Sequence, residues 1–510
     1  MANKIPYIHP FLFAVFPVLF LYSVNIDKIF FHETITSFLI VILVTVAALF
    51  ITKKIIKNSF KTGLLVSVFL ILFFSYGHVM EAIYISWLNS SFLPPPSHKY
   101  LLPFWILLFT GFAFYIIKSR RTFLNSNKII LLISIALNAS ILINIAYSEI
   151  NEKELQTKNK IFNIESKTPD KPRDIYYIIL DGYANAEILK KEFNFDNSEF
   201  LNRLTQKGFF IANKSCSNYA STFLSLASSL NMEYINTATE QAGKKSASWK
   251  ISYEMVRNNE LVRFLKSKGY KYYHLSSRHE ASDYNENATE NLSYSFMDNF
   301  AILLSQTTMI KAFVNIYEYD LRKSILFSFK KLQELNSIEG PKFIFAHIVS
   351  PHYPYLFDEN GEPVIETKRN RSGNRWKQKE NYINQLNFVN RKISEVVDKI
   401  ISSSKIAPII ILQADHGSAS TFNDLSLNQK QKLNKTMLEE RFKIFNALNL
   451  PEISDSVLSD SISPVNTFRV VFNTYFNTNF KLHKDKCYFS TYDTPSDLTD
   501  VTEIIKRLEK

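Results

Sequence analysis

Five long hydrophobic segments in the first 147 residues constrain this chain more than any other feature. They cover about residues 11–24, 36–51, 64–85, 101–117 and 129–146. A membrane-spanning helix needs roughly 20 mainly apolar residues, and shorter segments suffice when their flanks contribute. A buried soluble helix would keep a polar face at helical period, whereas these segments are apolar all round. No small-residue cleavage site follows the first segment, so a cleaved signal peptide is not expected. We therefore predict a transmembrane domain of five helices over residues 1–147.

The charges of the connecting loops predict how these helices are oriented. The second and fourth loops are strongly basic, whereas the first and third carry one lysine each. The basic residues concerned are Lys53, Lys54, Lys57 and Lys61 in the second loop, and Lys118, Arg120, Arg121 and Lys128 in the fourth. Loops rich in Lys and Arg stay in the cytoplasm. Five crossings then place the N-terminus inside and everything after residue 147 outside.

The remaining sequence is polar and mixed, and it predicts an α/β catalytic domain. Residues 148–172 form a polar linker that ends in a Pro-containing stretch, and residues 173–510 follow as one domain. Runs rich in β-branched and aromatic residues at 175–181, 271–277, 342–350 and 407–415 alternate with helical patterns such as 380–401. Strands interleaved with helices indicate a mostly parallel sheet covered by helices on both faces.

Charge and cysteine content exclude several classes of protein. The net charge of +12 comes from scattered Lys and Arg, with no basic stripe and no zinc-finger spacing, so we expect no nucleic-acid partner. The two cysteines, Cys216 and Cys487, cannot build a disulfide framework. A single bridge between them remains open at this stage.

Four short stretches place chemically useful side chains at the ends of predicted elements. Asp181 ends the first strand, His352 lies in a Pro-bounded turn after the third, and Asp415 and His416 end the fourth. Thr222 opens an apolar helix-like run. Because the carboxyl ends of parallel strands meet in one crevice, we expect these side chains to lie together.

These residue types suit a divalent cation and a nucleophile. Two carboxylates and a neutral imidazole are good ligands for such a cation. A hydroxyl at a helix N-terminus beside the cation can lose its proton near neutral pH. Taken singly, Asp181 is compatible with an ordinary turn, Thr222 with an N-cap and His352 with local hydrogen bonding. The order and context of all four stretches favour one site.

With these motifs in place, the chain resembles the alkaline phosphatase/sulfatase superfamily. It is similar to the membrane-anchored bacterial branch that includes lipoteichoic acid synthases and phosphoethanolamine transferases. The resemblance covers the five spans and about residues 173–492. It implies one divalent metal ion, zinc or manganese, held by Asp181, Thr222, Asp415 and His416, with Thr222 as the nucleophile. The segment "SPHYPY" resembles the substrate-site segment of the family and implies a catalytic role for His352.

The sequence also departs from several members of that superfamily. Formylglycine-dependent sulfatases need Cys or Ser followed by x-Pro-x-Arg, and "CSNYA" after Cys216 has neither the Pro nor the Arg. We recognise no histidine set for the second zinc of alkaline phosphatases. The disulfides common in phosphoethanolamine transferases would also need more than two cysteines.

Two ionisable residues stand out within the third hydrophobic segment. His78 and Glu81 lie three residues apart, on one face of a helix and near its predicted outward end. Such groups are functional candidates by default. Their position near the interface favours simple solvation among lipid headgroups, and contact with a lipid headgroup is the functional alternative.

Together these features predict a multi-pass enzyme of the bacterial cytoplasmic (inner) membrane whose catalytic domain faces the periplasm or outside. We expect it to transfer a phospho-alcohol group, phosphoglycerol or phosphoethanolamine, from a membrane phospholipid to a surface glycan or lipid-linked acceptor. The transfer would proceed through a phospho-threonine intermediate. One alternative is a phosphate or sulfate ester hydrolase on the same scaffold. A second is a catalytically silent membrane binding protein.

Overall fold

The computed structural model describes residues 5–88, 96–151, 165–243, 246, 248–295, 297–364, 375–422, 433–453 and 457–506. Contacts within the chain divide it into two units. The first comprises Met1–Glu154 and Phe296–Tyr319, and the second comprises Leu155–Ser295 and Asp320–Lys510. The sequence of the second unit is therefore interrupted by a segment that belongs to the first.

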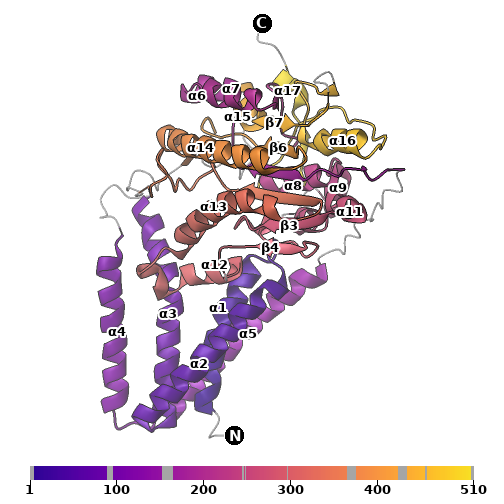
Figure 1. Ribbon diagram of the computed structural model, residues 1–510. Helices are drawn as coiled ribbons and strands as arrows, with labels where there is room; N and C mark the ends of the chain where they lie inside the picture. The colour runs from indigo at the N-terminus through magenta and orange to yellow at the C-terminus, as the bar shows by residue number, and fades with distance from the viewer. Residues whose placement is uncertain are drawn as a thin grey trace. The chain divides into compact units, whose positions relative to one another are not determined.

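The first unit is built on the five predicted spans, which are confirmed as long apolar helices (Figure 1). They are α1 (Ile5–Val24), α2 (Ile35–Ile56), α3 (Ser59–Leu88), α4 (His98–Lys118) and α5 (Leu124–Asn151), with a short 3-10 helix, η1 (Phe31–Thr34), before α2. By length and composition, all five can cross a membrane. A buried apolar cluster joins α1, α2 and α3 along their lengths.

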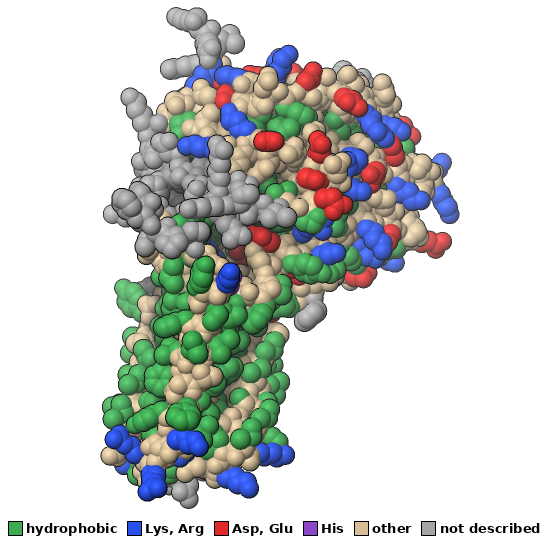
Figure 2. All heavy atoms as spheres, turned by 90° about the vertical axis from the view of Figure 1, so that its left-hand side faces the viewer, with side chains coloured by type: hydrophobic (Ala, Val, Ile, Leu, Met, Phe, Trp, Pro, Cys, Tyr) green, Lys and Arg blue, Asp and Glu red, His purple; other side chains and the backbone are tan. Residues whose placement is uncertain are grey.

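The two basic loops lie side by side at one end of this unit. The Nζ of Lys61, at the start of α3, donates hydrogen bonds to the carbonyl oxygens of Ile117 (2.8 Å) and Ser119 (2.7 Å) after α4. Towards the other end, the hydroxyl of Tyr76 in α3 lies 2.8 Å from Nδ1 of His98, where α4 begins. Figure 2 shows apolar side chains over the surface of this unit, with Lys and Arg gathered at one end of it. Charge is thus segregated as the orientation prediction requires.

The second unit is organised around a seven-stranded sheet of order β2-β7-β6-β1-β5-β3-β4. The strands are β1 (Ile175–Leu180), β2 (Phe210–Ile211), β3 (Lys271–Leu275), β4 (Glu290–Leu292), β5 (Lys342–Ile348), β6 (Ile409–Gln413) and β7 (Asn446–Asn449). The central strand β1 pairs in parallel with both β5 and β6, and β3 pairs in parallel with β4 and β5. Only the edge formed by β7 and β2 is antiparallel. The predicted mostly parallel sheet is confirmed.

Helices cover both faces of the sheet, which explains why every residue of β1 is buried. Tyr176, Ile178 and Leu180 point to one face and join a core with α13 (Ile316–Glu334) and α14 (Lys379–Ser403). Tyr177 points to the other face, where its ring lies 4.9 Å from that of Phe468 in α16 (Pro464–Tyr475). A strand that is buried on both faces has a continuous hydrophobic sequence instead of an alternating one, and the sequence of β1, "IYYIIL", is of this kind.

The other elements complete the two layers and the C-terminal region. They are α6 (Ala186–Phe193), α7 (Ser198–Gln206), α8 (Thr222–Asn231), α9 (Asn236–Ala242), α10 (Lys250–Arg257), α11 (Glu260–Ser267), α12 (Asn299–Thr307), α15 (Lys435–Phe442), α17 (Thr502–Lys506), β8 (Tyr488–Phe489) and β9 (Thr499–Asp500). Strands β8 and β9 form a separate antiparallel pair. Of these helices, α12 lies in the inserted segment of the first unit.

Candidate active site

The site lies at the carboxyl ends of the three central strands. Asp181 follows β1 directly, while Asp415 and His416 follow β6. His347 is the last residue but one of β5, and it pairs in register with Ile179 of β1. Because β1 lies between β5 and β6, Asp181 receives neighbours from both sides. The parallel sheet therefore brings these four side chains to one crevice, as an open α/β sheet is expected to do.

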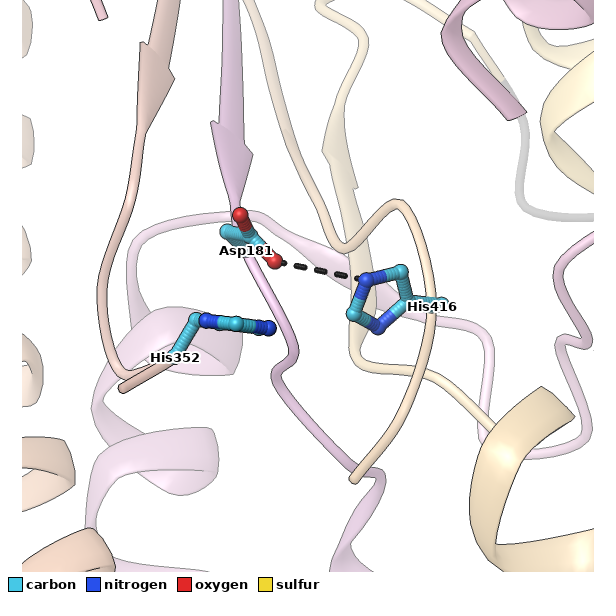
Figure 3. A group of neighbouring side chains, drawn as sticks. All are labelled: Asp181, His352 and His416. Carbon is cyan, nitrogen blue, oxygen red and sulfur yellow. Dashed lines mark ion pairs between the residues drawn. The ribbon is translucent and has the colours of Figure 1, made fainter. Parts of the chain in front are cut away.

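His416 contacts both carboxylates. Its Nε2 lies 3.4 Å from Oδ1 of Asp181 and 3.4 Å from Oδ2 of Asp415, and all three side chains are buried. Figure 3 shows Asp181 and His416 joined across the site, with the His352 ring approaching from the β5 side. The ring centroids of His352 and His416 are 5.8 Å apart.

Thr222 begins helix α8, and its hydroxyl points towards His416. Its Oγ1 lies 3.2 Å from Nε2 of His416. The preceding residue, Ser221, is the extended N-cap and makes no capping hydrogen bond with its side chain. Ser225, one turn later, donates its hydroxyl to the carbonyl of Tyr219 (2.9 Å), which ties the start of α8 to the incoming loop. The hydroxyl of Thr222 is thus held at a helix N-terminus, where the dipole favours negative charge.

His352 is held by the strand-end turn and by α14. Its backbone N–H donates to the carbonyl of Asp181 (3.0 Å), and its own carbonyl accepts from Nε2 of Gln385 (2.8 Å). The ring of Trp376 packs edge-on against the imidazole, with centroids 4.8 Å apart. Gly182 has φ +71°, and a Cβ there would come within 2.6 Å of the Trp376 ring. Only glycine suits this position, because the turn needs both the left-handed conformation and the close approach.

The tautomers of two histidines can be derived from their hydrogen bonds. Nδ1 of His416 lies 2.9 Å from the carbonyl of Gly417, and Nδ1 of His352 lies 2.5 Å from the carbonyl of Tyr353. A carbonyl oxygen only accepts, so each Nδ1 carries a proton and Nε2 of each ring is left to face the site. This is the arrangement by which metal-ligating histidines are usually oriented.

The donor atoms of the site fit a divalent cation. Two overlapping groups bring their ligand atoms within 4.8 Å of one another, namely Asp181 with His352 and His416, and Asp181 with His347 and Asp415. Oδ1 of Asp181, Oδ2 of Asp415 and Nε2 of His347 are buried without a hydrogen-bond partner. Two carboxylate oxygens and an imidazole nitrogen that converge in a buried site suit a positive charge between them. Carboxylate and imidazole ligands in this number are what zinc or manganese takes.

Electrostatics keep the site ready to bind a cation. Burial lowers the pKa of His416 well below its ordinary value, and the charge of Arg441 lowers it further, so the ring is neutral at pH 7. Burial alone would raise the pKa of Asp181, but the charge of His352 and the neighbouring His347 outweigh it and hold the pKa down. Burial and the charge of Asp181 raise the pKa of Asp415. The ligands thus include a neutral imidazole and an ionised carboxylate.

A buried arginine connects the two turns that carry Thr222 and the Asp415-His416 pair. The Nε of Arg441, in α15, donates to the carbonyl of Ala220 (2.7 Å), and its Nη1 donates to that of Gly417 (3.2 Å). Its Nη2 lies 3.3 Å from the hydroxyl of Tyr492. Because both carbonyls belong to turns next to site residues, Arg441 keeps Thr222 and His416 in register.

The structure brings together all five residues that the sequence predicts, namely Asp181, Thr222, His352, Asp415 and His416. It adds His347, which the sequence analysis did not assign to the site. The signal was present as a histidine inside the apolar run of β5, five residues before His352. His279 lies behind it, with ring centroids 5.5 Å apart. His347 was missed because strand pairing, not spacing, turns it toward the site.

Comparison with known proteins gives a family match. The model of the Sulfatase family matches residues 174–456. No curated protein matches the sequence.

Solved structures are similar only at low identity. The C-terminal periplasmic domain of EcEptC from Escherichia coli is 12% identical with a TM-score of 0.42, covering 66% of this chain and 95% of that one. The C-terminal periplasmic domain of phosphoethanolamine transferase EptC from Campylobacter jejuni is 12% identical with a TM-score of 0.39, covering 62% and 92%. BT1596, a 2-O GAG sulfatase, is 13% identical with a TM-score of 0.40, covering 63% and 73%.

Proposed function

The chain belongs to the Sulfatase family, and on that premise we propose that it is a metal-dependent transferase using Thr222 as nucleophile. It moves phosphoglycerol or phosphoethanolamine from a membrane phospholipid to a surface glycan or lipid-linked acceptor. The observation that carries the proposal is the hydroxyl of Thr222 at the start of α8, 3.2 Å from Nε2 of His416 and beside two buried carboxylates.

The identity of this residue favours transfer of a phosphoryl group over formylglycine chemistry. Conversion to formylglycine starts from Cys or Ser, and threonine carries a methyl group that prevents it from becoming an aldehyde. Cys216 lies six residues earlier, and its thiol contacts Cys487. The residue that faces the metal ligands is therefore a stable hydroxyl nucleophile.

The residues divide the reaction into two displacements. The Thr222 hydroxyl gives up its proton to solvent and its oxygen attacks the phosphorus of the donor, forming a Thr–O–P bond while the bond to the diacylglycerol oxygen breaks. His352, protonated on both ring nitrogens at this step, donates its Nε2 proton to that leaving oxygen. Its Nδ1 is held by the Tyr353 carbonyl (2.5 Å), so Nε2 faces the site. An acceptor hydroxyl then gives its proton to the now neutral Nε2 of His352 and attacks phosphorus, forming the acceptor O–P bond while the Thr–O–P bond breaks. A divalent cation, when bound, favours the Thr222 alkoxide and neutralises an oxygen of the phosphoryl group.

The five apolar helices support a lipid donor, because they anchor the enzyme in the bilayer that contains it. We place the protein in the bacterial cytoplasmic membrane with its second unit facing outward. Zinc or manganese would be held by Asp181, Asp415 and His416 together with Thr222, and His347 and His352 lie within reach of the same crevice.

The direct test is to trap the intermediate. Full-length enzyme in detergent, loaded with zinc or manganese, is incubated with phosphatidylglycerol or phosphatidylethanolamine, and its peptides are analysed by mass spectrometry. We expect a phosphoglycerol or phosphoethanolamine adduct on the peptide that contains Thr222, together with released diacylglycerol. Thr222→Ala should fold and bind metal but lose turnover by roughly 10³-fold or more, whereas Thr222→Ser should keep part of it.

The neighbouring Ser221 provides the matched control. Its side chain makes no capping bond, so Ser221→Ala should be mild and should leave the adduct in place. An adduct on Ser221, or an active Thr222→Ala enzyme, would show that the nucleophile is wrong. Release of free phosphoglycerol or phosphoethanolamine into water, without transfer to an acceptor hydroxyl, would favour the hydrolase alternative.

A further inference from the structure

The segment Phe296–Tyr319 interrupts the second unit but belongs to the first. It contains helix α12 and the 3-10 helix η3 (Met309–Ala312). Asp298 caps α12 by accepting a hydrogen bond from the backbone N–H of Ala301 (2.6 Å). The chain therefore leaves the catalytic sequence after β4, packs among the membrane helices and returns in α13. We call this part the inserted segment.

One side of the inserted segment is buried against the spans. Phe300 and Leu304 of α12 are 2% and 7% exposed and join the apolar cluster of α1, α2 and α3. The backbone at Gln306 passes so close to Gly77 of α3 that a Cβ on Gly77 would lie 2.2 Å from the Gln306 carbonyl oxygen. Contact this close needs glycine on the helix.

An ion pair also joins the inserted segment to α3, one turn after Gly77. The Nζ of Lys311 in η3 lies 3.5 Å from Oε2 of Glu81, one turn after Gly77 in α3. Glu81 is one of the two ionisable residues of the third hydrophobic segment, for which the sequence allows either solvation among headgroups or a functional contact. Its carboxylate is matched by a cation on the inserted segment, so the pair docks that segment onto α3.

The C-terminal part of the inserted segment exposes large apolar side chains. Phe313 is 72% exposed, Val314 47%, Tyr317 42% and Ile310 40%, all close in sequence to Lys311. Water would not favour such a group on an isolated surface. Apolar side chains mixed with tyrosines are typical of the boundary between headgroups and acyl chains.

The position within the unit identifies which end of the spans is involved. Helix α12 also packs against η1, and η3 packs against α4, which begins at His98. Both belong to the end away from Lys61 and the basic loops. This is the predicted outward end, where the first and third loops emerge.

We propose that the inserted segment seats in the outer leaflet of the membrane, with Ile310, Phe313 and Val314 in the boundary between headgroups and acyl chains. The partner is the lipid surface itself, because these side chains continue the apolar exterior of spans that already lie in it. The catalytic sequence then has a second attachment to the bilayer besides the linker after α5. Contact by a partner protein is the alternative that the experiment must separate.

The test measures accessibility directly and does not depend on turnover. Full-length protein with Cys216→Ser and Cys487→Ser receives a nitroxide at Phe313→Cys or at Val314→Cys and is reconstituted in vesicles of phosphatidylglycerol and phosphatidylethanolamine. We expect collisions with oxygen to exceed collisions with a water-soluble nickel chelate at both positions. Tyr284, 56% exposed in the second unit, is the matched control and should show the reverse.

Two glycine substitutions, one a control for the other, test whether contact with α3 holds the inserted segment in place. Gly77→Ala should raise nickel accessibility at position 313 several-fold by displacing the segment. Gly111→Ala in α4 should not, because a Cβ there meets no atom within 4 Å. Nickel access at position 313 equal to that at 284 in the parent protein would overturn the proposal. Protection from both reagents would also overturn it, because it would indicate a protein partner.

Discussion

At the scale of single residues, His347 is the side chain whose role depends most on its exact neighbours. Its Nδ1 lies 2.7 Å from the hydroxyl of Ser282, and its Nε2 lies 3.5 Å from Oδ2 of Asp181 without a hydrogen-bond partner. A buried imidazole nitrogen that faces a carboxylate and lacks a partner is suited to a cation. That nitrogen would otherwise carry a desolvation penalty that no hydrogen bond offsets.

We therefore expect His347→Gln to weaken binding of zinc or manganese by about 10–100-fold, the usual effect of losing one supporting group at a metal site. Competition with a chelating dye measures the affinity. His274→Gln is the control, because His274 is equally buried in β3 but both its nitrogens are engaged, by Tyr272 and by the Ser282 carbonyl. Equal metal affinity in both variants would exclude His347 from the site.

Cys216 separates the two kinds of nucleophile that the family uses. Its backbone bridges Lys443, and its thiol contacts Cys487, far along the chain. We expect Cys216→Ala to retain activity within about threefold, since no catalytic group is removed. Peptide mass spectrometry should find no aldehyde at position 216. An aldehyde there, or loss of turnover in a folded and metal-loaded Cys216→Ala enzyme, would require formylglycine chemistry.

At the scale of elements, α14 supports the turn that carries His352. Gln385 of α14 is fully buried; its Nε2 donates to the carbonyl of His352 (2.8 Å), and its Oε1 accepts from the backbone N–H of Leu356 (2.7 Å). One side chain thus satisfies backbone groups on both sides of the turn. Its loss would leave those groups buried and unpaired.

Gln385→Leu should lower the free energy of unfolding by roughly 2–4 kcal/mol, because leaving each buried polar group unpaired costs about 1–3 kcal/mol. It should also reduce kcat, since His352 loses its support. Chemical denaturation followed by fluorescence gives the first quantity. Glu395→Ala, which removes a surface ion pair with Lys392 on the same helix, should change stability by less than about 1 kcal/mol. Equal stability of the two variants would contradict the role given to Gln385.

At the scale of the whole molecule, the distribution of charge between loops determines the orientation in the membrane. We predict that a reporter fused after Lys510 is active outside the cytoplasm and that one inserted at Lys57 is active inside. The physical reason is the contrast between four basic residues in each of two loops and one lysine in each of the others. The opposite reporter pattern would separate the enzyme from its proposed acceptor and would contradict both the orientation and the proposed function.

Local physics made much of this protein predictable from its sequence. Hydropathy identified five spans because a helix in lipid must be apolar all round, whatever its neighbours are. Strand-like runs ending in Asp181 and in Asp415-His416 indicated a site because the ends of parallel strands converge. Thr222 and His352 were found because they open a helix or close a strand. Each of these signals is contained in a short stretch of chain.

Only the tertiary structure decided two further points. His347 joins the site because β1 and β5 pair with Ile179 opposite His347, and a register one residue different would turn the ring away. The inserted segment belongs to the membrane helices because Gly77 and Glu81 meet residues more than 200 positions later in the chain. Contacts between such distant residues leave no periodicity in either stretch, so they appear only once the chain is folded.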